Sequence, residues 1–375
     1  MDIKTLLRTK RKLNGFDKIM LVLNGVLALM LLLCYLAPIT NPCSFWPIAI
    51  LGLGYQVFLP ANLVFLLYWL IRSRPYMLIS GVCLLLGLGV FFKYWEFHFS
   101  NQPDKKASAD DIRMMSYNVH DFMNPFVDRG TQKEISNLIA DKQPDIITIQ
   151  EYTNNILDWK STNKALVTAM QSNNHYFKAY DYTSWDSTGI AIYTRYPIIN
   201  HGLVAPLPGD KSKLQAIFID VKYKNKIIRI YTAHLKPIDF EAPEHEYLHN
   251  LPHTGRLSIH ESMLIVNKLK IAFIKRSYQV SAIKKHIAKC PYPYLIAGDF
   301  NDTPASYSVT KLTSSLNNSF VKEGSGFGRT YNGKFPNFQI DYISATRNIE
   351  ILNHRVIEAK LSDHFPVRSD LKLQP

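Results

Sequence analysis

The first feature of the chain is a long apolar stretch near its start. Ile19–Ile71 contains no Asp, Glu, Lys or Arg in 53 residues. One helix of that length would measure about 80 Å, far more than the ~30 Å hydrocarbon core of a bilayer. Turn-forming residues gather in Pro38–Ser44 and divide the stretch. We therefore expect two membrane spans, at about 19–37 and 46–70, with a kink at Pro60 in the second.

A third uncharged run, Tyr76–Phe92, has 17 residues, the lower limit for a spanning helix. Tyr94 and Trp95 follow it and suit the membrane–water interface. A secretory signal peptide is the alternative for the first span, but that apolar region is too long and further apolar runs follow. The pattern therefore predicts an integral, multi-pass membrane anchor over residues 19–95, with the third span at 76–92 and the lipid bilayer as its partner.

Basic residues give the expected orientation. Residues 1–18 carry six Lys or Arg against two acids, and the short link between the second and third runs carries Arg72 and Arg74. The positive-inside rule then places residues 1–18 in the cytoplasm. Three spans would put the rest of the chain outside the cytoplasm, across the plasma membrane or a bacterial inner membrane. A re-entrant third segment would instead leave it inside, so both topologies stay open.

Beyond an expected polar linker at 96–110, residues 111–375 alternate apolar strand-like runs with helical patterns. The expected strands are Ile112–Val119, Asp145–Gln150, Gly189–Tyr193, Leu214–Tyr223, Lys226–Ala233, Tyr294–Ala297, Ile340–Ser344 and Val367–Leu373, and the expected helices are Thr131–Lys142 and Ser258–Lys289. The order is too irregular for a doubly wound parallel sheet. It favours an α/β domain with a two-sheet core and helices outside.

Composition narrows the class of protein. The 375 residues include 43 Lys or Arg and 30 Asp or Glu, and charged residues make up 19%, below the ~25% usual for soluble domains. Three of the four cysteines lie in the apolar half, and only Cys290 lies in the polar half, so no disulfide can form within that half. These values exclude a disordered chain, a disulfide scaffold and a simple cytosolic enzyme.

Polar side chains lie directly at the ends of the expected strands. The end of a buried strand is a rigid position from which a side chain can take part in catalysis or binding. The residues are Asn118, Glu151, His234, Asp299, Asn301, Asp341, Asp363 and His364. Their carboxylate and amide oxygens suit Mg²⁺ or Mn²⁺, with water and a substrate phosphate filling the remaining positions. The sequence has no cysteine cluster, GxSxG or Walker loop. A metal-assisted reaction at phosphorus is the chemistry that this set favours.

Six motifs, SYNVH, IQE, TAHL, GDFND, IDYI and SDHFPV, occur in this order. Together they resemble the endonuclease/exonuclease/phosphatase superfamily, which includes pancreatic-type deoxyribonuclease, AP endonucleases, neutral sphingomyelinases and inositol polyphosphate 5-phosphatases. The resemblance covers about Asp111–Leu373. It implies a four-layer α/β sandwich, two mixed sheets flanked by helices, and Mg²⁺-dependent hydrolysis of a phosphodiester or phosphomonoester by an activated water.

The resemblance also implies roles around the metal and the water. Glu151 would be the principal metal ligand, with Asn118 adjacent and Asp363 helping to hold the ion. Asp299 would orient or deprotonate the attacking water, supported by Asn301. Asn118 could instead cap a strand, and Asp363 could be a turn acid.

The remaining implied roles concern the phosphate. Asp341 would orient a His364 imidazolium against a phosphate oxygen, and His234 would donate to the phosphate or leaving group. His234 could alternatively be a satisfied core histidine. The substrate contacts would be Asn118, Asn301 and His234. His120 stands where some nucleases of the family have Asp, which leaves the number of metal ions open.

One segment, Pro237–Gly255, has no assigned counterpart in the family, and one helical stretch is strongly basic. Pro237–Gly255 holds His245, His249 and His253 at four-residue spacing, which on a helix could bind Zn²⁺. We expect a solvated lid loop there instead, overhanging the site. Lys268–Lys289 could meet anionic lipid or nucleic acid, although a solvated helix face is the simpler reading.

The sequence therefore predicts a membrane-anchored metal-dependent phosphoesterase with a substrate that is lipid-linked. A nuclease acting on DNA or RNA is the alternative, although no aromatic–basic interleaving typical of single-strand binding is present. A non-catalytic membrane receptor for a phosphorylated ligand is a third hypothesis. Its mark would be missing catalytic groups, and none is missing. No protein partner can be inferred.

Overall fold

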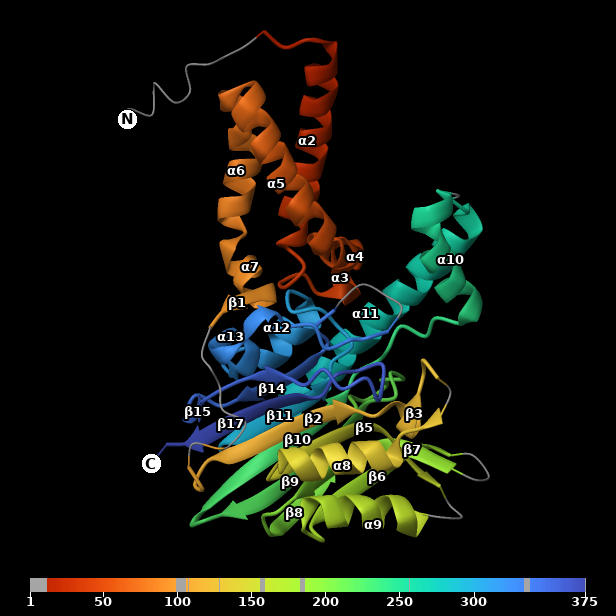
Figure 1. Ribbon diagram of the computed structural model, residues 1–375, viewed down its shortest axis with the longest axis vertical. Helices are drawn as coiled ribbons and strands as arrows, with labels where there is room; N and C mark the ends of the chain where they lie inside the picture. Colours follow the sequence, from red (N-terminus) through yellow and green to blue (C-terminus); the bar gives the residue numbers. More distant parts are fainter. Residues whose placement is uncertain are drawn as a thin grey trace.

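The computed structural model has an N-terminal helix bundle at one end and an α/β sandwich at the other (Figure 1). The residues that the structure describes are 12–98, 106, 108–127, 129–155, 159–182, 186–255, 257–333 and 338–374.

Within the described residues, two bundle helices are long and apolar enough to cross a membrane, α2 (Gly15–Cys34) and α5 (Tyr55–Arg72). A third candidate is the pair α6 (Met77–Leu86) and α7 (Leu88–Tyr94), bent by 62° at a one-residue break, Gly87. At 1.5 Å per residue, each of the two long helices measures about 27–30 Å, close to the thickness of a hydrocarbon core. The expected first and third spans thus correspond to α2 and to the α6–α7 pair.

The second span differs from the expected 46–70. Two short helices, α3 (Pro42–Phe45) and α4 (Pro47–Leu53), precede α5, and the break falls at Gly54. The physical reason lies in packing, because Ala49, Ile50 and Leu53 of α4 contact a helix of the sandwich rather than continuing the span. Pro60 lies inside α5, which runs through it as one helix.

Polar side chains join the bundle helices in the bundle interior. Asn24 of α2 donates to Ser80 Oγ of α6 at 2.7 Å, and Ser80 donates to Asn62 Oδ1 of α5 at 3.0 Å. Trp69 donates to Asn24 at 3.0 Å. Arg72 makes two 2.8 Å hydrogen bonds with Asp17 at the end far from the sandwich. Hydrogen bonds between helices compensate polar groups in an apolar setting, so these residues fix how the three helices pack.

One sheet of the sandwich has seven strands, in the order β15-β17-β2-β5-β7-β6, with β16 also paired to β17. Only β2 and β5 pair in parallel. The strands are β2 (Ile112–Asn118), β5 (Ile146–Asn155), β6 (His175–Tyr182), β7 (Asp186–Thr194), β15 (Ile349–Ile351), β16 (Arg355–Val356) and β17 (Val367–Leu373).

The other sheet has six strands, in the order β12-β14-β11-β10-β9-β8, and only β10 and β11 pair in parallel. The strands are β8 (Ile198–Leu203), β9 (Gln215–Tyr223), β10 (Lys226–His234), β11 (Tyr294–Asp299), β12 (Asn317–Asn318) and β14 (Asp341–Ala345). Both sheets are therefore mixed.

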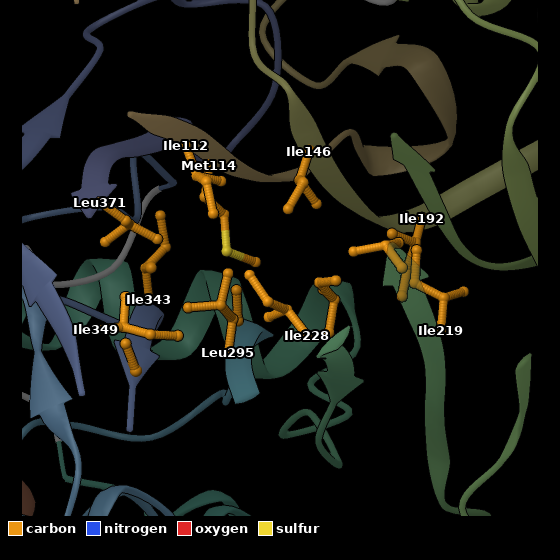
Figure 2. Packing of buried hydrophobic residues seen from close by; sticks show 14 of the residues in the cluster. Ile112, Met114, Ile146, Ile192, Ile219, Ile228, Leu295, Ile343, Ile349 and Leu371 are labelled. Atoms are coloured by element: carbon orange, nitrogen blue, oxygen red, sulfur yellow. The ribbon is translucent and has the colours of Figure 1, made fainter. Parts of the chain in front are cut away.

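An apolar core fills the space between the two sheets (Figure 2). Met114 and Ile146 of one sheet meet Ile228 and Leu295 of the other there, all of them fully buried. The outer face of the seven-stranded sheet is covered by α8 (Gln132–Lys142) and α9 (Trp159–Met170), and that of the six-stranded sheet by α11 (Ile259–Ile287) and α12 (Tyr307–Thr313). The predicted four-layer α/β sandwich is confirmed.

The bundle and the sandwich are joined by direct contacts. The linker expected at 96–110 begins inside a strand, because β1 (Trp95–Phe97) pairs with β13 (Ser325–Phe327) of the sandwich. The buried Tyr94 ring stacks on Tyr55 with ring centres 4.8 Å apart, and Ala305 of the sandwich joins the same apolar cluster. The boundary between the two parts is thus a packed interface.

The expected lid loop at Pro237–Gly255 is wrong, because its larger part forms the helix α10 (Ala242–Thr254). Glu241 and Glu244 form a capping box at its start, Pro243 occupies the first turn where a proline is tolerated, and Gly255 ends it in the left-handed conformation. The side chains of His245, His249 and His253 lie outside the described residues, so the structure does not test zinc binding there.

Candidate active site

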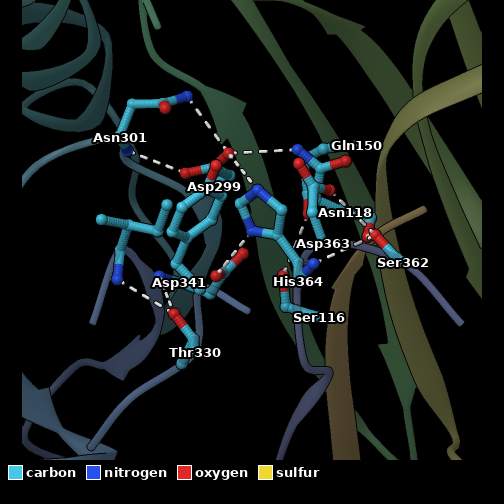
Figure 3. Close-up of polar contacts among 12 residues, drawn as sticks. Ser116, Asn118, Gln150, Asp299, Asn301, Thr330, Asp341, Ser362, Asp363 and His364 are labelled. Atoms are coloured by element: carbon cyan, nitrogen blue, oxygen red, sulfur yellow. Dashed lines mark hydrogen bonds and ion pairs between the residues drawn. The ribbon is translucent and has the colours of Figure 1, made fainter. Parts of the chain in front are cut away.

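Strand register brings the predicted residues to one end of both sheets. In the six-stranded sheet, His234 of β10 lies beside Asp299 of β11, which lies beside Asp341 of β14. In the seven-stranded sheet, Asn118 of β2 lies beside Gln150 of β5. Figure 3 shows the side chains of Asn118, Asp299 and Asp341 converging with that of His364 between the sheets.

Unusual backbone conformations aim these side chains. Gly298 has φ +145°, and a Cβ there would lie 2.0 Å from the carbonyl oxygen of Ala233, so only glycine fits before Asp299. Glu151 has φ +49° at an irregularity in the β5–β7 pairing, and Asn301 has φ +51°. Non-glycine residues in this region cost of order 1–3 kcal/mol each and gather at functional sites.

Asn118 links the two sheets. Its Nδ2 donates to Glu151 Oε1 at 3.0 Å and to Asp299 Oδ2 at 3.1 Å, and its Oδ1 accepts from the backbone N–H of His120 at 3.1 Å. This orientation makes Asn118 a donor that holds two carboxylates in place. Its expected role as a metal ligand stays a prediction.

Asp299 is the buried centre of the site. Its Oδ1 accepts the backbone N–H of Asn301 at 2.8 Å, and its Oδ2 accepts Asn301 Nδ2 at 3.1 Å. Burial raises the pKa of Asp299 to about 6; the positive charge of His364 opposes this rise and the negative charge of Asp341 adds to it. A carboxyl group that titrates near neutrality suits a general base.

Asp341 and His364 form a buried pair, with Asp341 Oδ2 and His364 Nδ1 3.0 Å apart. Burial acts to lower the pKa of His364, but the charges of Asp341 and Asp299 outweigh it and hold this pKa well above the usual range. Its Nε2 lies 3.7 Å from Asp299 Oδ2. The structure therefore presents a protonated imidazole toward the centre of the site.

His234 is 7% exposed, and its Nε2 is buried with no hydrogen-bond partner among the described residues. That atom lies 3.6 Å from both Glu151 Oε1 and Asp299 Oδ2. A buried nitrogen without a partner is costly unless a ligand or water completes it. A ligand or water bound in the site would supply the hydrogen bond that His234 Nε2 lacks.

His120 lies between two carboxylates at the mouth of the site. Its Nδ1 is 3.5 Å from Glu151 Oε2 and 3.4 Å from Asp363 Oδ1. The interaction with Glu151 raises the pKa of His120 against the opposing effect of desolvation. Desolvation also acts to raise the pKa of Glu151, but His120, His234 and Asn118 together lower it to about 2. Glu151 is therefore ionised at neutral pH.

Two supporting residues escaped the sequence analysis. Arg276, fully buried on α11, donates to the backbone oxygen of Asn301 and lies 3.4 Å from Asp302. The Thr330 hydroxyl accepts the backbone N–H of Asp341 at 3.1 Å. Both lie far in sequence from the motifs that they support. In the sequence, Arg276 is one of several basic residues in a helical stretch. A solvated basic face explains such residues equally well, so the sequence alone does not indicate that Arg276 is buried.

Two cavities meet at Glu151. One, of about 280 Å³, is polar and includes Lys213, Lys236, Lys275 and several acids. The other, of about 250 Å³, has apolar and aromatic walls beside His364 and Asp363. Those walls are Ile238, Phe240, Tyr331, Phe338 and Ile340. The site thus offers a charged side and an apolar side to one substrate.

Asp299, Asp341 and His364 form the only group of carboxylate and imidazole atoms, among the described residues, that is close enough to hold a metal ion. However, His364 Nδ1 lies 3.0 Å from Asp341 Oδ2, and the charges of Asp341 and Asp299 favour the protonated imidazole over the neutral form that binds a metal. Glu151 fits a hard cation better, because its carboxylate is ionised and 28% exposed toward the polar cavity.

Comparisons agree with this geometry. A family model described as a domain of unknown function, DUF8431, matches residues 17–94, and one described as Endonuclease/Exonuclease/phosphatase family matches residues 115–364. No curated protein matches the chain.

Similar solved structures share the sandwich. An endonuclease/exonuclease/phosphatase from Beutenbergia cavernae is 18% identical with a TM-score of 0.52, covering 70% of this chain and 72% of that one. A functionally unknown conserved protein from Enterococcus faecalis is 15% identical with a TM-score of 0.50, covering 70% and 100%. The human Nocturnin catalytic domain with bound sulfate anion is 14% identical with a TM-score of 0.49, covering 71% and 95%.

These identities establish a common fold and nothing finer. The family model, by contrast, covers well over half of the chain, from Met115 to His364. It spans every strand end that carries the candidate site. The chain belongs to the Endonuclease/Exonuclease/phosphatase family.

Proposed function

We propose that this protein is a membrane-anchored phosphoesterase that uses a divalent metal ion and hydrolyses a lipid-linked phosphoester. One observation supports the reaction class above the others. A protonated His364, a partnerless His234 nitrogen and an ionised Glu151 converge on one point from three different strands or loops. Two imidazole donors and one carboxylate are what a phosphate and its metal ion require.

In this proposal the chain's own groups act as follows. Asp299, held by Asn118 and Asn301, accepts a proton from the attacking water. His364, held by Asp341, neutralises charge on a phosphate oxygen. His234 donates from Nε2 to the phosphate or the leaving oxygen. Such prepositioned donors lower the barrier because they need no reorganisation as charge develops.

Glu151, helped by Asp363, would hold the metal ion, Mg²⁺ or Mn²⁺; both carboxylates lie within 3.5 Å of His120 Nδ1. The bound ion would supply Lewis-acid stabilisation of the phosphoryl oxygens. The same carboxylates raise the pKa of His120 and so favour its protonated form, and we propose that His120 moves away or stays neutral when the ion binds.

The substrate class follows from the surroundings of the site. The apolar cavity walls and the packed N-terminal bundle favour a phosphoester that is attached to a lipid. In the polar cavity the three lysines are matched by Asp121, Asp181 and Asp239, so this surface has no excess positive charge with which to grip a nucleic acid. DNA or RNA hydrolysis remains the second candidate, because the family includes nucleases.

We further propose that α2, α5 and the bent α6–α7 pair all cross the bilayer, with residues 1–18 in the cytoplasm and the sandwich outside it. The bundle supports three crossings. In Figure 1 one end of the bundle adjoins the sandwich. The other end, where α2 begins and α5 ends, lies far from it and contains the Asp17–Arg72 ion pair.

The decisive experiment is a substrate panel with the full-length protein in detergent. It should contain a phospholipid, a soluble aryl phosphodiester and single-stranded DNA, each with and without Mg²⁺. We expect metal-dependent hydrolysis that is highest for the lipid and is lost in Glu151→Gln, with unchanged thermal unfolding, because the variant removes an anionic ligand worth several kcal/mol. Hydrolysis that survives both EDTA and the substitution would refute the metal mechanism. Binding of phosphorylated ligands without any hydrolysis would support the receptor hypothesis instead.

A further inference from the structure

The N-terminal half of α11 is apolar on two faces. Ile265, Leu269 and Phe273 form the inner face, where they pack against Tyr247 and Leu248 of α10 and against α4. The outer face is exposed and also apolar, with Ile259 at 80%, Met263 at 64% and Val266 at 37% exposure, preceded by Leu257 at 78%. These outer residues follow the i, i+4, i+7 spacing of one helix face. The two faces are neighbours on the helix, and the outer one needs an apolar environment that the cluster under α11 does not supply.

This exposed face lies at the height of the bundle. α10 and the start of α11 rise from the sandwich on the side of the N-terminal bundle, to the level of α4 and α5 (Figure 1). Contacts confirm the proximity, because α11 packs directly on α3 and α4. An apolar groove of about 490 Å³ is formed by Trp46 of the bundle and seven residues of 257–267. The groove thus joins the exposed α11 face to the bundle.

Further apolar side chains extend this surface. Leu36, Ile39 and Phe45, in and after the turn that follows α2, are 41%, 73% and 55% exposed. Lys270 lies 5.4 Å from the ring of Trp46. Aromatic rings and lysines of this kind gather where a protein meets lipid headgroups. Exposed apolar side chains therefore lie both on the turn after α2 and on α11, and Trp46 lines the groove between the bundle and α11.

We infer that the hairpin formed by α10 and the N-terminal half of α11 is a second membrane contact, one that lies in the headgroup region beside the spans. This inference rests on the membrane anchoring proposed above. An interfacial helix of this type enters about 5–10 Å into the headgroup and acyl boundary. The occupant of the exposed face and of the groove is bilayer lipid.

The same surface leads to the candidate active site. Ile238 and Phe240 pack in the cluster under α11, and both also form walls of the cavity that contains His364 and Asp299. The apolar cluster under α11 therefore extends as far as the wall of the phosphoester site. The hairpin deepens the proposed function, because it gives a lipid-linked substrate a way in that does not leave the membrane surface.

The test uses single fluorescent labels on the full-length protein in lipid vesicles, with the four native cysteines replaced. Met263→Cys reports the hairpin, Leu29→Cys on α2 reports the span, and Asp141→Cys on α8 is the water-exposed control. We expect quenching at position 263 by nitroxide lipids, strongest when the nitroxide lies near the headgroup. Position 29 should be quenched best by nitroxides deeper in the acyl chains, and position 141 by neither.

The quenching results at positions 29 and 263 test the anchor and the hairpin separately. Quenching at 29 without quenching at 263 would overturn the hairpin inference and leave the anchor intact. Absence of quenching at both positions would overturn the anchor and the hairpin together.

A second measurement compares Ile259→Asp with Ile199→Asp, the same change at an exposed isoleucine of β8. Removing an apolar side chain from lipid should lower hydrolysis of a vesicle-embedded ester about tenfold in the α11 variant. The β8 variant should keep that rate, and both should keep the rate on the soluble aryl diester. Equal rates of the two variants on vesicles would contradict the inference.

Discussion

At the scale of single residues, the site depends on charges that fix one another. Asp341 is fully buried and bonds His364 through one oxygen, while its other oxygen has no hydrogen-bond partner among the described residues. The Asp341 side chain therefore hydrogen-bonds only His364 among the described residues. Its contribution is to orient the imidazole and keep it protonated.

This coupling gives a testable non-additivity. Asp341→Asn should mis-orient His364 and lower hydrolysis by up to about 10⁴-fold, the loss that follows the equivalent change in a serine-protease triad. His364→Ala and the double variant should then be about equally inactive, because groups that act as a unit are not additive. Rates of the three variants on a soluble diester decide this. Losses that multiply in the double variant would show that the two residues act separately.

A second residue-scale prediction concerns stability and pH. Burial lowers the pKa of His354 to about 4, and its Nδ1 lies 2.8 Å from Ser319 Oγ. Between about pH 6.5 and pH 4 the unfolded chain binds a proton at this histidine and the folded chain does not, so stability is complete above this window and falls as the pH drops through it.

The fall attributable to His354 should reach at most about 3 kcal/mol. His354→Gln keeps a polar partner for Ser319 and cannot titrate, so its unfolding midpoint should decline less between pH 7 and pH 4. The exposed His201→Gln is the matched control and should retain the wild-type decline. An identical pH dependence in all three proteins would refute the assignment.

Most candidate site residues could be predicted because each directly follows a strand run that is itself recognisable. Asp299 after YLIAG and His234 after RIYTA are examples. Arg276 could not be found this way, since its contact with the Asn301 backbone joins a helix to a loop 25 residues later. The bridging position of His120 likewise depends on positive φ angles that local sequence does not announce.

At the scale of elements, strands with continuous apolar runs were predictable and edge elements were not. The strand β17 was expected at Val367–Leu373 and lies there. By contrast, β8 (Ile198–Leu203) is an edge strand with mostly exposed positions, so it shows no alternation of apolar and polar residues. The break at Gly54 also had no local signal, because α4 leaves the span direction to pack on α11, a contact between distant segments.

Asn62 gives a prediction for the bundle. Its Nδ2 donates to the carbonyls of Leu27 and Phe58, and its Oδ1 accepts from Ser80, so it connects α2, α5 and α6. Interhelical hydrogen bonds in membranes average about 0.6 kcal/mol each. Asn62→Leu should therefore cost about 1–2 kcal/mol and lower the unfolding temperature in detergent. Leu63→Ala, at a 45% exposed neighbour, should change it less. The reverse order would contradict the network.

At the scale of the whole molecule, the proposed orientation can be tested with a membrane-impermeant thiol probe. In a background without native cysteines, Ser108→Cys next to the sandwich should be labelled in intact cells, whereas Lys12→Cys at the other end of the bundle should be labelled only after lysis. Both positions are exposed. The opposite pattern would place the sandwich in the cytoplasm, and equal labelling of both would mean that the bundle does not cross three times.

The packed junction between bundle and sandwich also determines how far from the membrane the catalytic site can lie. Among the described residues, the Tyr94–Tyr55 stack, the β1–β13 pair and the contacts of α4 with α11 hold the spans directly against the catalytic end. In a bilayer, the site would therefore stand at one fixed height, and a phosphate would be accessible only at that height. Turnover should then depend on the mole fraction of substrate in the surface rather than on its bulk concentration. Diluting the substrate with inert lipid should slow the enzyme, and adding buffer should not.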